Sequence, residues 1–149
     1  MTAPTSIDET APVIARHEIE IAAPLATVWG LHTDINAWPT WQTEVTSARI
    51  VGPLEPGATF AWSTFGLDVT STVYRVEEHS GTLWGGPASG IDGVHEWIFR
   101  ETPTGVRVST SESWSGPPVD ADAATLQAQL DASLVSWLRH LKAAAEAAS

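Results

Sequence analysis

The stretch DADAATLQAQLDASLVSWLRHLKAAAEA, residues 120–147, decides the fold. Its apolar residues recur at spacings of three and four, as on one face of a helix; they are Leu126, Leu130, Leu134, Trp137, Leu138 and Leu141. Asp120 or Asp122 can cap the start of this helix, and Arg139 and Lys142 near its end suit the helix dipole. A lone amphipathic helix of about 26 residues, about 39 Å long, must lay its apolar face on a sheet.

The residues before this helix supply such a sheet. Seven segments show the alternation or the glycine and proline boundaries of strands: residues 13–21, 44–51, 58–65, 68–77, 82–85, 91–101 and 106–115. Between the first two, residues 25–32 and 33–39 predict two short helices. A turn at Gly66-Leu67 would set Trp62 opposite Ser71. The expected fold class is α+β, with a curved antiparallel seven-stranded sheet wrapped around the long C-terminal helix.

Composition narrows the function. The chain has 149 residues, a net charge of −11 at pH 7 and no cysteine, which excludes disulfides and thiolate nucleophiles. Seven Lys and Arg residues are too few for a nucleic-acid surface. We expect a single domain over residues 12–149 after a flexible tail of residues 1–11. No stretch reaches the roughly 18 apolar residues of a membrane span, and no signal-peptide pattern is present, so we expect a cytoplasmic monomer or homodimer.

Tryptophan is the unusual residue of this composition. The chain holds eight tryptophans against three phenylalanines and one tyrosine. Aliphatic residues fill a small core without an N–H group that needs a partner, whereas rigid indole rings suit a wall around a space. Because a helix and a curved sheet diverge at one end, we expect a hydrophobic cavity between them that is lined by several of the tryptophans.

Five strings of the sequence resemble the START-like (SRPBCC) superfamily, and most closely its polyketide cyclase/dehydrase type. They are IAAPLATVWGLHTDINAWPTWQTEV at 21–45, GPLEPGATFAW at 52–62, VHEWIF at 94–99, ESWSG at 112–116 and LDASLVSWLRHLKAAAE at 130–146. The resemblance implies a helix-grip fold and a small hydrophobic molecule that is bound, or transformed, in an internal cavity.

The hairpin of residues 91–101 and 106–115 places two polar side chains together. If Glu101 pairs with Val106, then His95 faces Glu112 on the mostly apolar side of the hairpin. A carboxylate beside an imidazole can act as a general acid–base pair, and His95 and Glu112 are therefore the catalytic candidates. The same pair can equally be a buried tie between two strands, and the sequence leaves both interpretations open.

Further residues are candidates for the ligand-binding wall; they are Trp29, His32, Trp38, Trp62, Trp97, Thr110, Trp114, Leu126, Leu130 and Leu134. We expect His32 near the mouth of the cavity, and Trp41 and Trp137 packed in the core. His17 is expected to approach Glu112 or Trp114. No close-spaced metal-ligand motif occurs, so we expect neither a metal nor a cofactor.

Three functions fit these features. The first is an enzyme that cyclises or dehydrates an aromatic or polyketide-like molecule through His95 and Glu112. The second is a carrier, sensor or sequestering protein that uses the same cavity without chemistry. The third is a protein-interaction domain whose tryptophans meet a partner. In the first two the partner is a small hydrophobic or aromatic molecule, and nucleic acid and membrane insertion are not expected.

Overall fold

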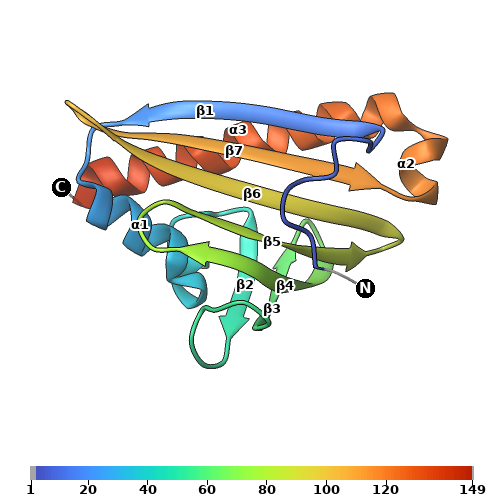
Figure 1. The fold of residues 1–149 in the computed structure, drawn as a ribbon, viewed down its shortest axis with the longest axis horizontal. Coiled ribbons are helices and arrows are strands. Elements are labelled where there is room, and N and C mark those ends of the chain that lie inside the picture. The colour runs from blue at the N-terminus through green and yellow to red at the C-terminus, as the bar shows by residue number, and fades with distance from the viewer. Residues whose placement is uncertain (1–2, 149) are drawn as a thin grey trace.

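The computed structural model describes residues 3–148 and folds one antiparallel sheet around one long helix (Figure 1). The strands are β1 (Val13–Ile21), β2 (Val45–Ile50), β3 (Thr59–Thr64), β4 (Leu67–Glu77), β5 (Gly81–Ala88), β6 (Ile91–Thr102) and β7 (Gly105–Ser115). Their order across the sheet is β1-β7-β6-β5-β4-β3-β2, so β1 pairs with β7 as expected. The predicted α+β, helix-grip architecture is confirmed.

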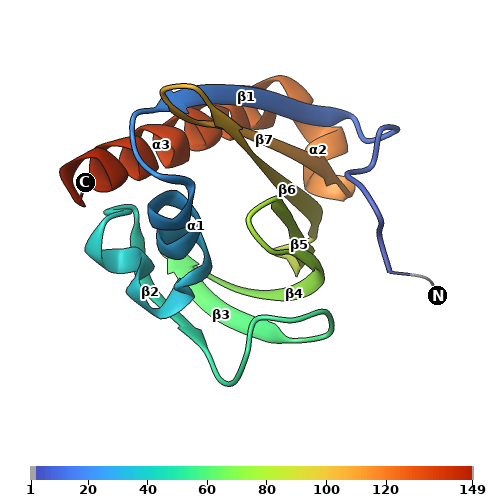
Figure 2. The same cartoon turned by 60° about the vertical axis from the view of Figure 1, so that its left-hand side comes forward.

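Four helical segments complete the chain. Helix α1 (Leu25–Thr33) and the 3₁₀ helix η1 (Ile35–Thr40) lie between β1 and β2, while α2 (Pro117–Ala121) and α3 (Ala123–Ala148) follow β7. The sheet bends from β1 and β7, which lie along α3, round to β3 and β2 on the opposite side of the molecule (Figure 2). Among residues 3–148, no helix combines the length and the apolar character needed to cross a membrane.

The single C-terminal helix predicted from Asp120 is in fact two. Pro117 and Pro118 begin the short helix α2, and Asp122 has φ −155° and ψ 62°, values that a helix does not tolerate. The Asp122 carboxylate then accepts a hydrogen bond from the backbone N–H of Thr125 at 3.4 Å, which caps α3. Of the two aspartates proposed as caps, Asp122 is thus the one used by the long helix.

The predicted register of the β3–β4 hairpin was wrong by two residues. Trp62 pairs with Val69 rather than with Ser71, because the turn is Phe65-Gly66 and not Gly66-Leu67. Both turn residues have positive φ, 50° at Phe65 and 76° at Gly66, as a tight type I′ turn requires. A shift of two residues preserves the alternation of the strand, so the face of Trp62 was predicted correctly.

Strand β5 is longer than the predicted residues 82–85, since it continues through Gly85, Gly86 and Pro87 to Ala88. Its pairing with β4 ends at Gly85, whereas its pairing with β6 extends to Ala88. Beyond Gly85 the strand is therefore an edge on its β4 side, where proline loses no ladder hydrogen bond.

The core consists of two groups of buried side chains. The larger one gathers aromatic residues around η1, the central strands and the second half of α3, among them Trp38, Trp84, Trp97 and Trp137. The smaller one packs Val13 and Ala15 of β1 against Leu130 and Leu134 of α3. Between the two groups, side chains of both face a common space, which is described below.

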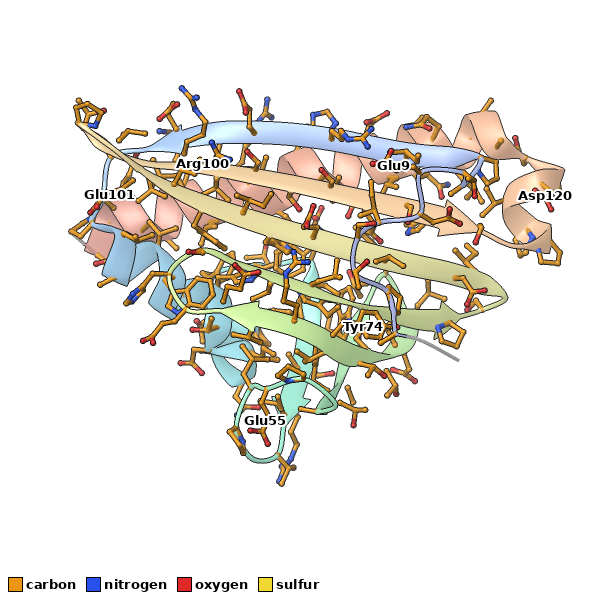
Figure 3. All side chains as sticks on the ribbon, viewed as in Figure 1. Glu9, Glu55, Tyr74, Arg100, Glu101 and Asp120 are labelled. Atoms are coloured by element: carbon orange, nitrogen blue, oxygen red, sulfur yellow. The ribbon has the colours of Figure 1, made fainter. Side chains whose placement is uncertain are left out.

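The described part of the predicted tail, residues 3–11, runs across the outer face of the sheet, with Glu9 towards one end of the segment and Tyr74 of β4 near the other (Figure 3). Ile7 is buried, and the backbone N–H of Asp8 donates to Ser113 Oγ at 2.9 Å. Arg75 donates to the Thr5 carbonyl at 2.9 Å. These contacts tie the segment to β4 and β7, while Met1 and Thr2 lie outside the described residues.

Candidate functional site

A cavity of about 570 Å³ lies between the inner face of the sheet and α3. Its interior wall carries the indoles of Trp62, Trp84, Trp114 and Trp137. Its mouth is marked by side chains that also meet solvent, Phe65 and Leu67 of the β3–β4 hairpin, Ser89 of the β5–β6 turn, and Gln129 and Ala132 of α3. The volume is within the range of pockets that enclose drug-sized ligands.

The aromatic wall is rigid because its rings brace one another. Trp62 packs edge-on against Trp84, with ring centroids 5.9 Å apart, and against Trp137 at 6.2 Å. Trp38 stands behind them, edge-to-face with Trp62 and Trp137, and its indole N–H donates to the His32 carbonyl at 3.0 Å. Such edge-to-face pairs are the favoured arrangement of aromatic rings. Trp38 therefore supports the wall, whereas we predicted it as a ligand contact.

Of the three leucines of α3 predicted to line the cavity, only Leu126 does so. Leu126 lines the cavity, together with Gln129, Ala132, Ser133 and Trp137. Leu130 and Leu134 are fully buried against β1 and do not line it. The strongest apolar stripe of α3 thus packs on the sheet, and its flank faces the cavity. The expectation that Trp137 packs in the core is only half right, because this buried ring also forms part of the wall.

A carboxyl group and an imidazole meet at the inner end of the cavity. The predicted register of the β6–β7 hairpin is confirmed, with Glu101 opposite Val106 and His95 opposite Glu112. His95 Nδ1 lies 3.1 Å from Glu112 Oε1, and both residues line the cavity. The His95 side chain is 4% exposed and that of Glu112 is 17% exposed, so the carboxyl group is the more accessible of the two.

Hydrogen bonds extend this pair in both directions. On one side His95 Nε2 lies 2.6 Å from Thr110 Oγ1, and the Thr110 hydroxyl donates to the Glu96 carbonyl at 3.1 Å. Because the hydroxyl proton is used there, Nε2 donates to Thr110 and Nδ1 is left as an acceptor. Glu112 satisfies Nδ1 only when it carries a proton. On the other side the Trp114 indole N–H donates to Glu112 Oε2 at 2.6 Å.

The pKa values agree with this neutral arrangement. Burial raises the pKa of Glu112 to about 7, although the hydrogen bond from Trp114 opposes the rise. Burial, together with the nearby His32, lowers the pKa of His95 to about 3. In a dry site the charged forms are disfavoured, and the proton shared by the pair therefore resides on Glu112 below pH 7. Glu112 is then poised to give up or take a proton near neutral pH.

Gly93 keeps open the space in front of this carboxyl group. It pairs with Trp114 across β6 and β7 and lines the cavity. A Cβ atom at this position would lie 3.6 Å from Glu112 Oε2 and 3.4 Å from Trp114 Cδ1. Any side chain here would occupy the approach to Glu112.

Gln42 and Glu44 form a second polar part of the wall, which we did not predict. Glu44 Oε1 accepts a hydrogen bond of 2.5 Å from the Ser136 hydroxyl of α3. The Gln42 carboxamide oxygen accepts from the Glu44 backbone N–H at 3.1 Å, while its buried Nε2 has no hydrogen-bond partner within residues 3–148. No pattern in the sequence around Gln42 and Glu44 distinguishes them from surface residues.

Four other predicted wall residues do not reach the cavity. Trp29, His32 and Trp97 are packed together with Phe99 beneath α1, and Thr110 lies behind His95. His32 was expected near the mouth, but it is 3% exposed and its Nε2 lies 2.8 Å from Thr82 Oγ1. Burial lowers the pKa of His32 to about 3.

His17 also differs from the prediction. It points towards α3 rather than towards Glu112 or Trp114, and its Nε2 lies 2.7 Å from Asp131 Oδ1. It therefore ties β1 to the helix. Trp62 and Trp114, in contrast, line the cavity as predicted.

Comparisons with known proteins agree with this geometry. Residues 12–146 match the family model described as polyketide cyclase / dehydrase and lipid transport. A Streptomyces halstedii protein that carries the provisional name polyketide cyclase is 29% identical over an alignment of 107 residues, and the match covers 60% of this chain and 90% of that protein.

Solved structures show the same fold. A hypothetical protein of Helicobacter pylori superimposes with a TM-score of 0.80 at 20% identity, over 97% of this chain and 99% of its own. A START superfamily protein of Mycobacterium smegmatis has a TM-score of 0.77 at 14% identity, over 91% and 99% of the two chains. The di-domain ARO/CYC StfQ from the steffimycin biosynthetic pathway has a TM-score of 0.71 at 18% identity, over 90% of this chain and 50% of its own. The chain therefore belongs to the polyketide cyclase / dehydrase and lipid transport family.

Proposed function

We propose that this protein binds a small hydrophobic or aromatic, polyketide-like molecule in the cavity and catalyses its cyclisation or dehydration by acid–base chemistry. One observation carries the proposal: a carboxyl group whose pKa burial raises to about 7 lies beside a neutral imidazole, at the inner end of a cavity walled by four indoles. Catalytic acids and bases work best when their pKa is near the working pH. The family description and the name of the Streptomyces relative support the same reaction class.

The reaction would use one shuttled proton. Above pH 7 the Glu112 carboxylate takes a proton from a carbon next to a substrate carbonyl. The resulting carbanion forms a bond to the carbon of a second carbonyl, and Glu112 returns the proton to the new alkoxide oxygen. In dehydration Glu112 takes a neighbouring C–H proton and delivers it to the leaving hydroxyl, so that water departs and a C=C bond forms. Each cycle restores the starting state of the pair, and no other reactant is required.

His95 and Thr110 would keep the carboxylate in position while it is ionised. When Glu112 is ionised, the tautomer of His95 that carries its proton on Nδ1 becomes the favoured one, because Nδ1–H can then donate to the carboxylate 3.1 Å away. The freed Nε2 then accepts from the Thr110 hydroxyl, which lies 2.6 Å away. This change of tautomer leaves both polar ends of the imidazole satisfied. The cavity wall contributes the other part of catalysis by holding a flexible chain in a folded conformation.

A carrier or sensor for a hydrophobic molecule is the second candidate function. It is favoured by the hydrogen bonding of His95, because both ring nitrogens already have protein partners and neither is free for a substrate. The family description also includes lipid transport.

One experiment separates the two functions. The protein is incubated with a poly-β-keto N-acetylcysteamine thioester, and mass spectrometry follows the loss of one water per ring closed. We expect the wild type and Glu101→Gln, an exposed control at the end of β6 labelled in Figure 3, to form product at equal rates. We expect Glu112→Gln to bind the thioester but to form product at least about a hundredfold more slowly. Equal rates in Glu112→Gln would show that this carboxyl group is not the acid–base group, and binding without product in the wild type would leave only the carrier function.

A further inference from the structure

The ionisable groups of the cavity wall are all acids or a neutral imidazole. Within the described residues 3–148, the wall contains Glu44, Glu112 and His95, and neither a lysine nor an arginine. Glu44 immediately precedes β2, and Glu112 lies on β7. Among the strands that line the cavity, β2 and β7 are at opposite ends of the sheet order, so the two carboxyl groups come from opposite sides of the sheet. A ligand of the cavity thus meets a carboxyl group on each of two walls.

The basic residues of the chain are engaged elsewhere. Arg16 pairs with Glu9, Arg75 with Glu96, Arg107 with Glu20, and Lys142 with Glu146. Arg49, Arg100 and Arg139 are exposed and do not line the cavity. The side chains that donate to the two carboxyl groups carry no charge: the Ser136 hydroxyl donates to Glu44 and the Trp114 indole N–H to Glu112. His95, which also contacts Glu112, is a neutral imidazole.

An anionic ligand in this space would face a large unfavourable energy. It would lose its hydration, find no cation in the wall, and be repelled by carboxylates that water screens poorly in the interior. A neutral ligand with hydroxyl groups is stabilised in the same space, because carboxylate oxygens accept the hydrogen bonds that hydroxyls donate. A cationic amine gains further, since indole faces attract cations.

We propose that the cavity selects its ligand by charge, accepting neutral or cationic aromatic molecules that donate hydrogen bonds, such as phenols and amines, and rejecting carboxylates and sulfonates of the same skeleton. The inference rests on the ligand-binding half of the proposed function and narrows its substrate class. A polyketide-like substrate would enter as a thioester, ester or lactone, or as a phenol, and not as a free acid.

Two fluorescent probes that differ by one anionic group test the inference. N-phenyl-1-naphthylamine is neutral, and 1-anilinonaphthalene-8-sulfonate adds a sulfonate to the same skeleton; both brighten in apolar surroundings. Titrations are made at pH 8, where Glu112 is ionised, and in high salt, which screens the surface charge of −11 but not buried groups. We expect the neutral probe to bind at least about tenfold more tightly than the sulfonate.

Substitutions assign the selectivity to the cavity. In Glu44→Gln and Glu112→Gln, and most of all in the double variant, the sulfonate should bind about tenfold more tightly while the neutral probe changes by less than about threefold. Glu55→Gln removes one charge from the exposed β2–β3 loop at a position that does not line the cavity, and should change neither affinity (Figure 3). Wild-type affinities that agree within about threefold would overturn the inference alone. Binding of neither probe would overturn the proposed ligand-binding function, and the inference with it.

Discussion

His95 Nδ1 lies 3.1 Å from Glu112 Oε1 because the two residues face each other directly across β6 and β7. Directly opposed residues are the closest side-chain neighbours that a sheet provides, so the hairpin register alone brings them together. What the register does not decide is their ionisation. That follows from the apolar surroundings, which favour the neutral forms of both groups.

The first prediction concerns the partner on the far side of Glu112. The Trp114 indole N–H donates to Glu112 Oε2 at 2.6 Å and so stabilises the ionised carboxylate, which lowers its pKa. Trp114→Phe removes this donor and should raise the pKa of Glu112 further above 7, by about one unit. Since the carboxylate is the base, kcat/KM of the wild type should rise with pH and level off above about 7, and in the variant the midpoint of this rise should move to higher pH.

The measurement is the pH profile of kcat/KM, supported by ¹³C NMR titration of the Glu112 carboxyl group. An unmoved midpoint in both would mean that the hydrogen bond does not control the ionisation.

The second prediction compares a glycine in front of the carboxyl group with a glycine that has open space around it. Gly93→Ala places a methyl group at normal contact distance from Trp114 and Glu112 Oε2, 3.4 and 3.6 Å away. The variant should fold as the wild type does, but it should lose at least about tenfold in kcat/KM because the methyl group blocks the approach to the carboxyl group. Gly30→Ala in α1 is the matched control, since a Cβ there meets nothing within 4 Å. It should retain activity and gain about 0.5–1 kcal/mol in the free energy of unfolding. Equal activity of the two variants would place the reaction elsewhere in the cavity.

The sequence predicts the fold and the central pair well because both follow from alternation. A hairpin with strong alternation has a register that sets His95 opposite Glu112, and a long amphipathic helix requires a sheet to cover. The turn at Phe65-Gly66 escaped prediction for a local reason. An aromatic residue at φ 50° is rare, so the pattern favoured glycine as the first turn residue.

The cavity wall is harder to predict, because it depends on how α3 is rotated about its axis. The apolar stripe shows which residues are buried, but it cannot distinguish Leu130, which packs on β1, from Leu126, which faces the cavity. The aromatic residues pose the same problem, since Trp38 and Trp62 contact each other and only Trp62 reaches the cavity. Gln42 and Glu44 carry no pattern that separates a wall residue from a surface residue.

The third prediction tests the strained turn at the mouth. Phe65 has positive φ, is 69% exposed, and lines the cavity entrance. Asparagine is the residue that a type I′ turn prefers before glycine, so Phe65→Asn should raise the free energy of unfolding by about 1 kcal/mol. It should also release a bound neutral probe several times faster, because an apolar group is lost from the mouth. Urea denaturation and stopped-flow dissociation of N-phenyl-1-naphthylamine give the two values. A variant that is both more stable and unchanged in release would show that the ring has no part in retaining the ligand.

The last prediction is a loss of stability in acid that depends on His32. Its pKa is lowered to about 3 in the folded protein by burial among Trp29, Trp97 and Phe99. An unfolded histidine binds a proton below about pH 6.5 and the folded one does not, so folding loses about 1 kcal/mol per pH unit as the pH falls from 6.5.

His95 adds a second loss of the same size, since its pKa is also lowered to about 3. Glu112 works in the opposite direction: its pKa is raised to about 7, and the folded protein therefore gains a proton that the unfolded chain binds only near pH 4.5. Between pH 6.5 and 5 one histidine and Glu112 offset each other, and the net loss is about 1 kcal/mol per pH unit.

His32→Phe keeps a ring in place and should make the free energy of unfolding nearly independent of pH over this range. The variant should be less stable than the wild type at every pH, because the buried Thr82 hydroxyl loses its partner. His79→Asn, at an exposed position with φ 61°, should keep the wild-type dependence. Urea denaturation at pH 5 and pH 6.5 measures both, and an unchanged pH dependence in His32→Phe would show that this histidine is protonated in the folded state.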